Sequence, residues 1–362
     1  DTVNHKILAY KLDYYGIRGQ ANSWFKSYLT NRYQSVTLNG ETSEKLPIGC
    51  GVPQGSILGP LLFLIYINDM NLAFKHALVH HFADDTNLLY SDKDPKRLKK
   101  IMNSELKLLF DWLCANRLSL NVNKTEFIIF RPPRKTLNYR FVLKLNNTSI
   151  YESHKIKYLG ILLDDRLSWK VHLSELSKKL SRSVGMLYRL RHFCPNTVLR
   201  SLYFSLFNSH LSYGLPIWGN ADRINIEKIK ILQKRAVRAI TFSSSLSSSE
   251  TIFKSLGILK LDDMLRFQIS ALMWDYDHNT LPTALTCYFK EINLIHHYQT
   301  RSSYHGKLTT NKYNTDRYGK NSFQNQGSKT LNEIKTMDIY KDANSKSSFL
   351  NKYKKIIFEN YI

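Results

Sequence analysis

Two adjacent aspartates, Asp84 and Asp85, have the type and setting that most clearly suggest chemistry. They stand between two short apolar runs, 78–83 and 86–90, which predict a β-hairpin with both carboxylates at its tip. Unpaired carboxylates held against a packed sheet are costly, so we expect a divalent cation to neutralise them. Mg²⁺ suits such a site because it takes one or two carboxylates together with substrate phosphates. An ordinary Asp-rich turn is the structural alternative.

A glycine- and proline-rich loop, residues 49–60, lies upstream of this hairpin. Glycine lets a backbone approach a ligand closely, and the Gln54 amide offers donors and an acceptor to a sugar or a base. Proline and glycine also punctuate ordinary surface turns. Combined with the two aspartates, however, the loop favours a binding site. Its central residues are Gly51, Val52, Pro53, Gln54, Gly55 and Ser56.

The elements that must position these groups follow from the hydrophobic periodicity and the turn signals. In the first half they are a helix over 5–29 broken at Gly16 and Gly19, a strand over 34–38 turned at Asn39-Gly40, an apolar helix over 61–70, the hairpin 78–90, an amphipathic helix over 98–116, and strands over 127–130, 140–145 and 158–163.

The second half is predominantly helical by the same criterion. Residues 170–240 have a basic polar face, which we expect to contact nucleic-acid phosphates without reading sequence; a solvated helix face is the alternative. A serine-rich linker over 242–250 precedes a helix over 251–274. Residues 301–362 carry twelve Lys/Arg against five Asp/Glu and weak periodicity, so we expect partial disorder with a last helix over 348–361. The basic residues expected to contact phosphates include Lys178, Lys179, Arg182 and Arg189.

Charge and composition narrow the class of protein. The chain has 362 residues, 43% of them hydrophobic, with 52 Lys+Arg against 29 Asp+Glu and a net charge of +23. Such an excess indicates a polyanionic partner, and the 12% of aromatic residues fits base stacking. The four cysteines form no zinc-type or disulfide pattern, which indicates reduced, intracellular thiols. The longest uncharged apolar run, 61–67, is too short to span a bilayer, so no membrane partner is expected.

Ordered short strings give the sequence a specific resemblance. The loop 51–56 and the string Phe82-Ala83-Asp84-Asp85 resemble the template/nucleotide loop and the catalytic hairpin of reverse transcriptases, particularly those of LINE-type, jockey-like non-LTR retrotransposons. Several strings in the right order carry far more weight than one. The supporting strings lie at 1–5, 27–34, 66–69, 118–121, 124–126, 158–161, 213–214, 218–219 and 233–236.

The resemblance implies an α+β fold: a right-hand polymerase palm, with an antiparallel sheet and packed helices, followed by an α-helical thumb and a C-terminal extension. It implies RNA-directed DNA polymerisation with two Mg²⁺ ions, or Mn²⁺. Asp84 and Asp85 would bind metal, and Lys124 would lie near the leaving pyrophosphate. The residues implied to face nucleotide and template are Pro53, Gln54, Gly55 and Ser56, and those implied to form the primer grip are Tyr158, Leu159 and Gly160.

The implied partners are an RNA template, a DNA primer and dNTPs, with an intracellular location that the family suggests is nuclear. The oligomeric state stays open. The expected domains are the palm (1–168), a helical thumb and connection (169–240), a C-terminal helical region (241–300) and a basic tail (301–362).

The resemblance also implies that a segment upstream of Asp1 is missing here. In the family, the fingers and the first metal-binding aspartate precede the position that Asp1 matches, so we expect Asp1 to cap the following helix instead of binding metal. We expect this fragment alone to be inactive in primer extension for the same reason.

Three other interpretations remain open at this point. A truncated or domesticated retroelement relic would only bind nucleic acid. A group II intron maturase shares the polymerase core, but the strings around Trp218 and at 233–236 favour a retrotransposon. A viral RNA-dependent RNA polymerase fits less well, because Ala83 stands where that class has glycine.

Overall fold

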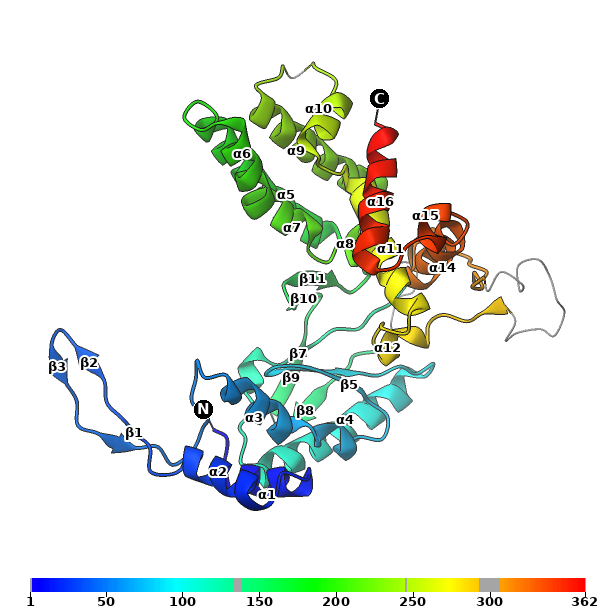
Figure 1. Cartoon of the computed structure of the whole chain (residues 1–362). Helices are drawn as coiled ribbons and strands as arrows, with labels where there is room; N and C mark the ends of the chain where they lie inside the picture. Colours follow the sequence, from blue (N-terminus) through cyan, green and yellow to red (C-terminus); the bar gives the residue numbers. More distant parts are fainter. Residues whose placement is uncertain (1, 133–138, 147, 245, 293–306, 362) are drawn as a thin grey trace. The chain divides into compact units, whose positions relative to one another are not determined.

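The computed structural model describes residues 2–132, 139–146, 148–244, 246–292 and 307–361. The chain is a mixed α+β protein that divides into two compact units, Asp1–His154 and Lys155–Ile362 (Figure 1). The expected first boundary at residue 168 differs from this division. The hairpin over 155–164 belongs with the helical second unit because its second strand packs against the helix that follows it.

Three helices form the first core of unit 1. Helices α1 (His5–Tyr14) and α2 (Gly19–Leu29) are separated at Gly16, whose φ of 92° ends the first helix, as the sequence predicted. Helix α3 (Leu58–Ile67) is apolar on all sides and packs against α1. Asn4 caps α1 by accepting hydrogen bonds from the backbone of the first turn. Asp1, the cap expected from the sequence, lies outside the described residues.

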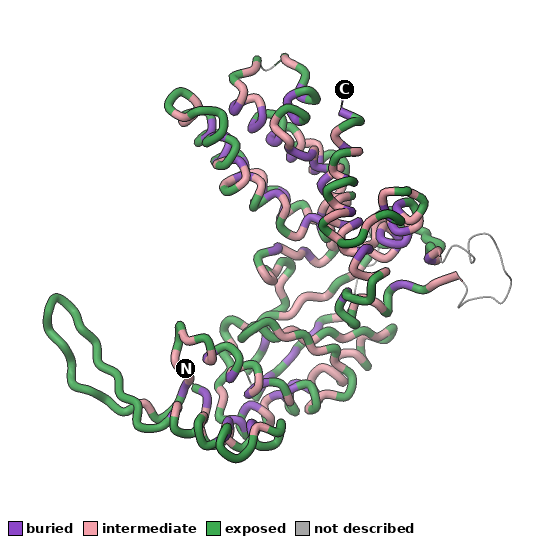
Figure 2. The backbone as a smooth tube through the Cα atoms, viewed as in Figure 1, coloured by how far each residue is buried: buried purple, intermediate pink, exposed green. Residues whose placement is uncertain are grey.

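An arm of two short ladders follows α2. Strand β1 (Tyr33–Gln34) pairs with β4 (Leu46–Pro47), and β2 (Thr37–Leu38) pairs with β3 (Glu41–Thr42) around the predicted Asn39-Gly40 turn. Figure 2 shows that the arm is exposed along its length. Its strands are only two residues each because no second layer covers them among the described residues.

A second core of unit 1 lies between a long helix and a small sheet. Helix α4 (Pro95–Ala115) begins at the Asp94 cap and packs leucines against β8 (Leu143–Leu145) and β9 (Thr148–Glu152). Strand β7 (Glu126–Phe127) runs parallel to β9, whereas β8 is antiparallel to it. The sheet is therefore mixed, not purely antiparallel as expected. The β8–β9 hairpin turns the chain so that β9 returns in the direction of β7.

The second unit opens with a hairpin and continues as helices. Strands β10 (Lys155–Tyr158) and β11 (Ile161–Asp164) pair around a turn within the range that we predicted as one strand. The long helices α5 (Lys170–Leu190) and α9 (Arg223–Thr241) pack side by side (Figure 1). The connecting elements are α6 (Asn196–Leu202), the π-helix η3 (Tyr203–Asn208), α7 (Ser209–Ser212), α8 (Leu215–Trp218), α10 (Glu250–Leu256), α11 (Leu261–Asp277) and α12 (Thr283–Thr286).

The C-terminal region completes the core of unit 2. Helices α14 (Phe323–Ile334) and α16 (Lys346–Glu359) pack on α11, with α15 (Asp338–Lys341) between them and the π-helix η5 (Asp316–Lys320) before them. Their apolar side chains are buried, so residues 307–361 are folded where the sequence suggested partial disorder. The buried residues include Leu331, Ile334, Phe349, Tyr353 and Tyr361.

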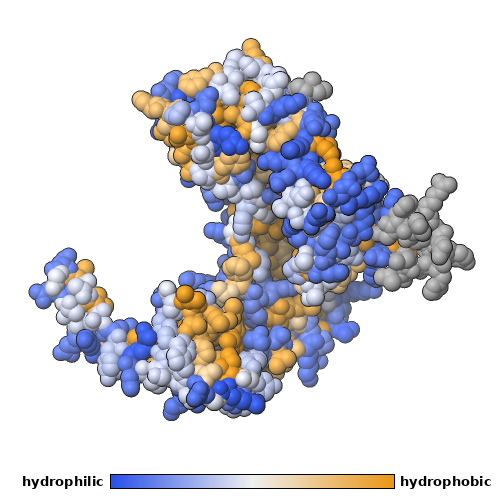
Figure 3. Space-filling view, viewed as in Figure 1, coloured by the Kyte–Doolittle hydropathy of each residue, from blue (hydrophilic) through white to orange (hydrophobic). Residues whose placement is uncertain are grey.

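None of the described helices combines the length and the apolar character that a membrane crossing requires. Apolar side chains nevertheless reach the surface of unit 1 over α3 (Figure 3), where Ile57, Leu61 and Leu64 are exposed.

Candidate active site

The two candidate carboxylates lie at a hairpin turn. Strands β5 (Leu78–Phe82) and β6 (Asp85–Leu89) pair with Phe82 opposite Asp85, so Ala83 and Asp84 form the turn. Ala83 has a φ of 52°, a conformation that glycine would adopt without strain. Asp84 and Asp85 are both exposed, and so are their neighbours on either side. The expectation that they lie against a packed sheet was therefore wrong. These carboxylates are accessible to ligands, and because they are hydrated they do not need a cation to offset a cost of burial.

A histidine beside the turn was not singled out by the sequence analysis. The Nδ1 atom of His81 lies 3.1 Å from the Thr86 hydroxyl across the hairpin, and its Nε2 is buried without a hydrogen-bond partner in the described structure. Burial lowers the pKa of His81, and the neighbouring His80 lowers it further. The ring is therefore biased towards its neutral form. It adds no positive charge to the base of the aspartate turn.

A buried carboxylate anchors the start of the hairpin. Glu105 of α4 is 2% exposed and accepts three backbone hydrogen bonds, from Lys75 and His76 at 2.8 and 2.7 Å and from Ala77 at 3.1 Å. These amides lead directly into β5. Nothing in the sequence distinguished Glu105 from the other acidic residues of an amphipathic helix, so this positioning residue was missed.

The glycine-rich loop is held at both ends. At its start, the Gly51 amide donates to Val3 at 2.8 Å, and the Gly51 carbonyl accepts from His5 Nε2 at 2.7 Å. Ser56 then donates to the Pro53 carbonyl at 2.7 Å and accepts from the Gly59 amide at 2.9 Å, which starts α3.

The end of this loop has no room for a side chain at Gly59, whereas the centre of the loop is exposed. A Cβ added to Gly59 would lie 2.6 Å from the Pro53 carbonyl oxygen, so glycine is required there. Gln54 and Gly55 are exposed between the two anchors, whereas Pro53 and Ser56 are half-buried. The loop thus presents the Gln54 side chain from a fixed backbone.

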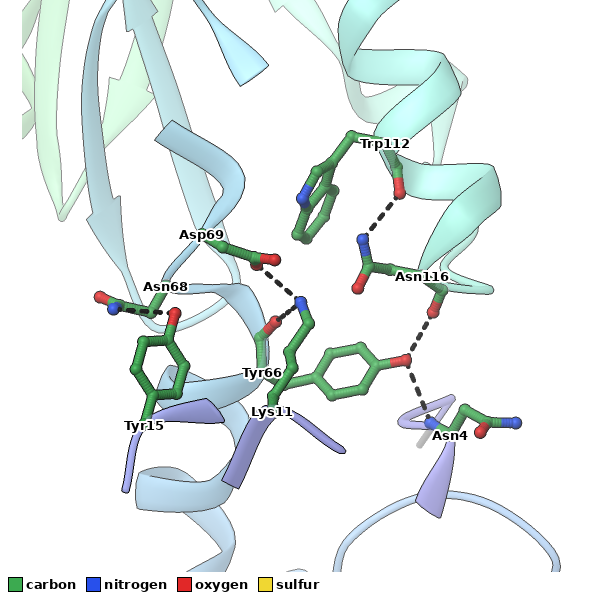
Figure 4. A network of polar contacts seen from close by, with 8 residues as sticks. All are labelled: Asn4, Lys11, Tyr15, Tyr66, Asn68, Asp69, Trp112 and Asn116. Atoms are coloured by element: carbon green, nitrogen blue, oxygen red, sulfur yellow. Dashed lines mark hydrogen bonds and ion pairs between the residues drawn. The ribbon is translucent and has the colours of Figure 1, made fainter. Parts of the chain in front are cut away.

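A largely buried polar network joins α1, α3 and the end of α4 within unit 1 (Figure 4). Lys11 of α1 donates at 2.6 Å both to the Tyr66 carbonyl and to Asp69. The Tyr66 hydroxyl donates to the Asn116 carbonyl at 2.5 Å and accepts from the Asn4 amide at 3.3 Å. Burial lowers the pKa of Lys11 although Asp69 acts in the opposite direction. The string at 66–69 therefore serves as a structural cross-link between α1, α3 and α4.

The remaining candidate of unit 1, Lys124, is exposed at the end of the short 3₁₀ helix η2 (Val122–Lys124), just before β7. The described residues contain no group of three or more His, Cys, Asp or Glu side chains that could hold a metal. Asp84 and Asp85 supply the hard oxygen ligands that Mg²⁺ prefers, and they fit as part of a ligand set.

The expected primer-grip residues form the β10–β11 turn of unit 2. Leu159 and Gly160 have φ of 45° and 81°, and Tyr158 pairs with Ile161. The hydroxyl of Tyr213 donates to the Leu159 carbonyl at 2.6 Å, and a Cβ on Gly160 would lie 3.4 Å from the Tyr213 ring.

The strings at 213–214, 218–219 and 233–236 have structural roles. Gly214 has a φ of 62°, and a Cβ there would lie 2.5 Å from Ile161. Buried Trp218 donates to the Tyr213 carbonyl at 2.9 Å. Gln233 is 1% exposed, donates to the Leu259 carbonyl at 2.9 Å and accepts from the Leu261 amide at 3.0 Å. Gly214 and Trp218 thus support the turn through their contacts with Ile161 and Tyr213, whereas Gln233 fixes the segment that leads into α11.

A groove of about 530 Å³ runs between α5 and α9. Lys178 and Arg182 of α5 and Lys228 of α9 line it, together with serines of α5. Lys178 also pairs with Glu175 at 2.7 Å. The other two expected phosphate contacts, Lys179 and Arg189, are exposed on α5 outside this groove. The lining residues are Lys170, Leu173, Ser174, Ser177, Lys178, Ser181, Arg182, Asn225 and Lys228.

Comparisons with known proteins show which family the first part of the chain is similar to. Residues 1–163 match the family described as "Reverse transcriptase (RNA-dependent DNA polymerase)". The chain is 29% identical over 272 residues to the "Probable RNA-directed DNA polymerase from transposon BS" of Drosophila melanogaster, covering 70% of this chain and 28% of that protein.

Other relatives are of the same kind. The "RNA-directed DNA polymerase from mobile element jockey" of Drosophila melanogaster is 28% identical over 67% of this chain and 27% of its own length. A retrovirus-related Pol polyprotein from a type-1 retrotransposable element of Bradysia coprophila is 26% identical over 61% of this chain and 22% of its own length. The chain thus spans less than a third of these relatives. Residues 1–163 are a reverse transcriptase domain, distantly homologous to those of jockey-like non-LTR retrotransposons.

Proposed function

We propose that this chain is the palm and thumb part of an RNA-directed DNA polymerase from a non-LTR retrotransposon. The observation that carries the proposal is the pair Asp84 and Asp85, exposed at a turn whose approach is fixed by buried Glu105, within a reverse transcriptase domain. The palm would occupy residues 1–168 and the helical thumb and connection 169–240. The regions 241–300 and 301–362 would support the thumb, because their helices complete its core.

The proposed reaction joins a primer 3′-hydroxyl to the α-phosphate of a dNTP and releases pyrophosphate. Asp84 and Asp85 would hold Mg²⁺, or Mn²⁺, which when bound stabilises the attacking and leaving oxygens. Gln54 and the backbone of Gly55 would contact the incoming nucleotide and the template from the anchored loop. Lys124 would donate a proton to the leaving pyrophosphate as a general acid.

Two surfaces of unit 2 would bind the RNA template and DNA primer. The β10–β11 turn, including Tyr158, would contact the primer, since its backbone is fixed by the Tyr213 hydrogen bond. The α5–α9 groove would bind backbone phosphates through Lys178, Arg182 and their neighbours. Lys179 and Arg189 would add charge on the exposed surface of α5.

Primer extension on poly-rA/oligo-dT with Mg²⁺ tests the polymerase proposal. It should be measured for residues 1–362 and, in parallel, for a polypeptide that is extended at its N-terminus by the residues encoded upstream of Asp1. We expect Asp84→Asn to reduce the extension rate by on the order of a thousandfold or more, because a metal ligand is lost. The control Asp111→Asn, an exposed aspartate on α4, should leave it unchanged. An Asp84→Asn protein that extends primers at the normal rate would contradict the metal assignment.

A nucleic-acid-binding relic is the second candidate. It is favoured by the setting of the aspartate pair, since the described residues group no third acidic or histidine side chain with it. Template–primer binding without extension by either polypeptide would support this candidate over the polymerase.

A further inference from the structure

We propose that α2 carries a stacking site for a base of single-stranded nucleic acid, built from Trp24, Tyr28 and Arg32. Trp24 and Tyr28 are four residues apart on α2, so they lie above one another on one face of the helix, and Arg32 follows soon after the helix ends at Leu29. The rings of Trp24 and Tyr28 are stacked, with centroids 5.7 Å apart and planes 11° from parallel. The Arg32 guanidinium lies 5.3 Å from the centre of the Tyr28 ring.

The platform is fixed on one side and open on the other. Tyr28 covers one face of the Trp24 ring, and Phe25 meets it edge-on at 5.0 Å and 81°. Phe25 and Tyr28 pack against the core that contains Leu29. Trp24 is nevertheless 54% exposed. A base that stacks on its open face would therefore meet a ring that is already ordered, which lowers the entropic cost of binding.

The charge around the site favours a polyanion as the occupant. The exposed charged residues of α1, α2 and the segment up to Arg32 are four cations and one acid, within a chain of net charge +23. Phosphates beside a stacked base would be neutralised by Arg32 and its neighbours. A second copy of this chain would bring the same positive surface, and like charges repel. The exposed residues counted are Lys6, Arg18, Lys26, Arg32 and Asp13.

Any base can stack on an aromatic ring, so the site would tolerate sequence and require unpaired bases. A duplex would offer only its terminal base pairs. The inference goes beyond the proposed polymerase reaction, because it concerns equilibrium binding and requires neither metal nor nucleotidyl transfer. It holds equally for an inactive chain.

The test is a pair of titrations of residues 1–362, with a labelled single-stranded oligo-dT and with an abasic oligomer of the same length. We expect oligo-dT, but not the abasic oligomer, to quench the part of the tryptophan fluorescence that Trp24→Phe lacks, since the chain has five tryptophans. Trp24→Ala should weaken oligo-dT binding on the order of tenfold and leave abasic binding unchanged. Trp24→Phe, which keeps a ring, should retain most of the affinity and also shows that the fold tolerates the change.

The matched control is Tyr10→Ala on α1, since Tyr10 is 73% exposed and is not part of the stacking site. This variant should bind oligo-dT normally. Equal affinity for oligo-dT and the abasic oligomer, or normal oligo-dT binding by Trp24→Ala, would overturn the proposal. So would a Trp24→Ala protein that loses self-association in sedimentation but binds oligo-dT normally, because the surface would then serve a second copy.

Discussion

A few individual side chains fix the backbone around the candidate site through their hydrogen bonds. Asp84 and Asp85 are exposed, so the fold does not hold them by burying them. It holds the segment that leads into β5 through Glu105, and it holds the start of the glycine-rich loop through the hydrogen bond between His5 and the Gly51 carbonyl. Sequence patterns revealed the exposed aspartates because their string is distinctive. They did not reveal Glu105, because its role depends on amides thirty residues away in the chain.

Replacing Glu105 with alanine should destabilise unit 1 by about 3 kcal/mol, because three backbone donors lose their buried, charged acceptor. Urea unfolding measures the change. Hydrogen exchange at residues 75–77 should become faster even where the unit stays folded. Glu44→Ala in the exposed arm is the control and should have little effect. Unaltered exchange at 75–77 in Glu105→Ala would show that the carboxylate does not hold this segment.

Buried His172 should make the stability of unit 2 depend on pH. Burial lowers its pKa from 6.5, and the charge of Lys179 lowers it further. Below about pH 6.5 the unfolded chain therefore binds a proton that the folded chain does not, so the free energy of unfolding falls as the pH falls. We expect His172→Gln to flatten the decline in melting temperature between pH 7.5 and 5.5, values chosen to be roughly one unit to each side of the ordinary histidine pKa. Exposed His210→Gln serves as the control, and equal slopes in all three proteins would refute the assignment.

At the scale of elements, local signals were sufficient where a turn or a helix cap determines the structure. The Asn39-Gly40 turn, the break at Gly16 and the hairpin around Asp84 were all predicted and confirmed. The segment 158–163 was predicted as one strand because its residues are apolar. It contains a hairpin turn because Leu159 and Gly160 adopt positive φ, and this turn is supported by Tyr213, which follows α7.

That support gives a prediction for the proposed primer grip. Tyr213→Phe removes the hydrogen bond to the Leu159 carbonyl but keeps the ring against Gly160. The loss of about 1 kcal/mol should speed hydrogen exchange at residues 158–161. In an extending polypeptide, the KM for template–primer should rise several-fold with little change in kcat, since the primer is held less firmly. Tyr188→Phe on α5 is the control. A lower kcat at unchanged KM would contradict a primer-positioning role.

On the scale of the whole molecule, the sequence indicated the excess of positive charge but did not indicate that the C-terminal region is folded. The tail beyond residue 300 looked polar and aperiodic, yet its sparse apolar residues are spaced to bury against α11. Tyr361 alone donates to Asp263 and accepts from the Lys260 amide. Pairing across such a distance in sequence leaves no local signal. The excess of positive charge, in contrast, is a property of composition and is visible before any fold is known.

The position of this charge in the α5–α9 groove leads to a prediction about the salt dependence of nucleic-acid binding. If the α5–α9 groove binds phosphates, affinity for an RNA–DNA hybrid should fall steeply with salt, with a slope of log K against log salt of about −0.9 per phosphate contact. The double variant Arg182→Gln/Lys228→Gln should make this slope shallower by the amount that corresponds to about two phosphate contacts, because one cation is lost from each wall of the groove. The double variant Lys100→Gln/Lys107→Gln on exposed positions of α4 removes the same net charge and should leave the slope almost unchanged. Equal slopes for the two double variants would mean that the overall charge of +23, and not the groove, governs binding.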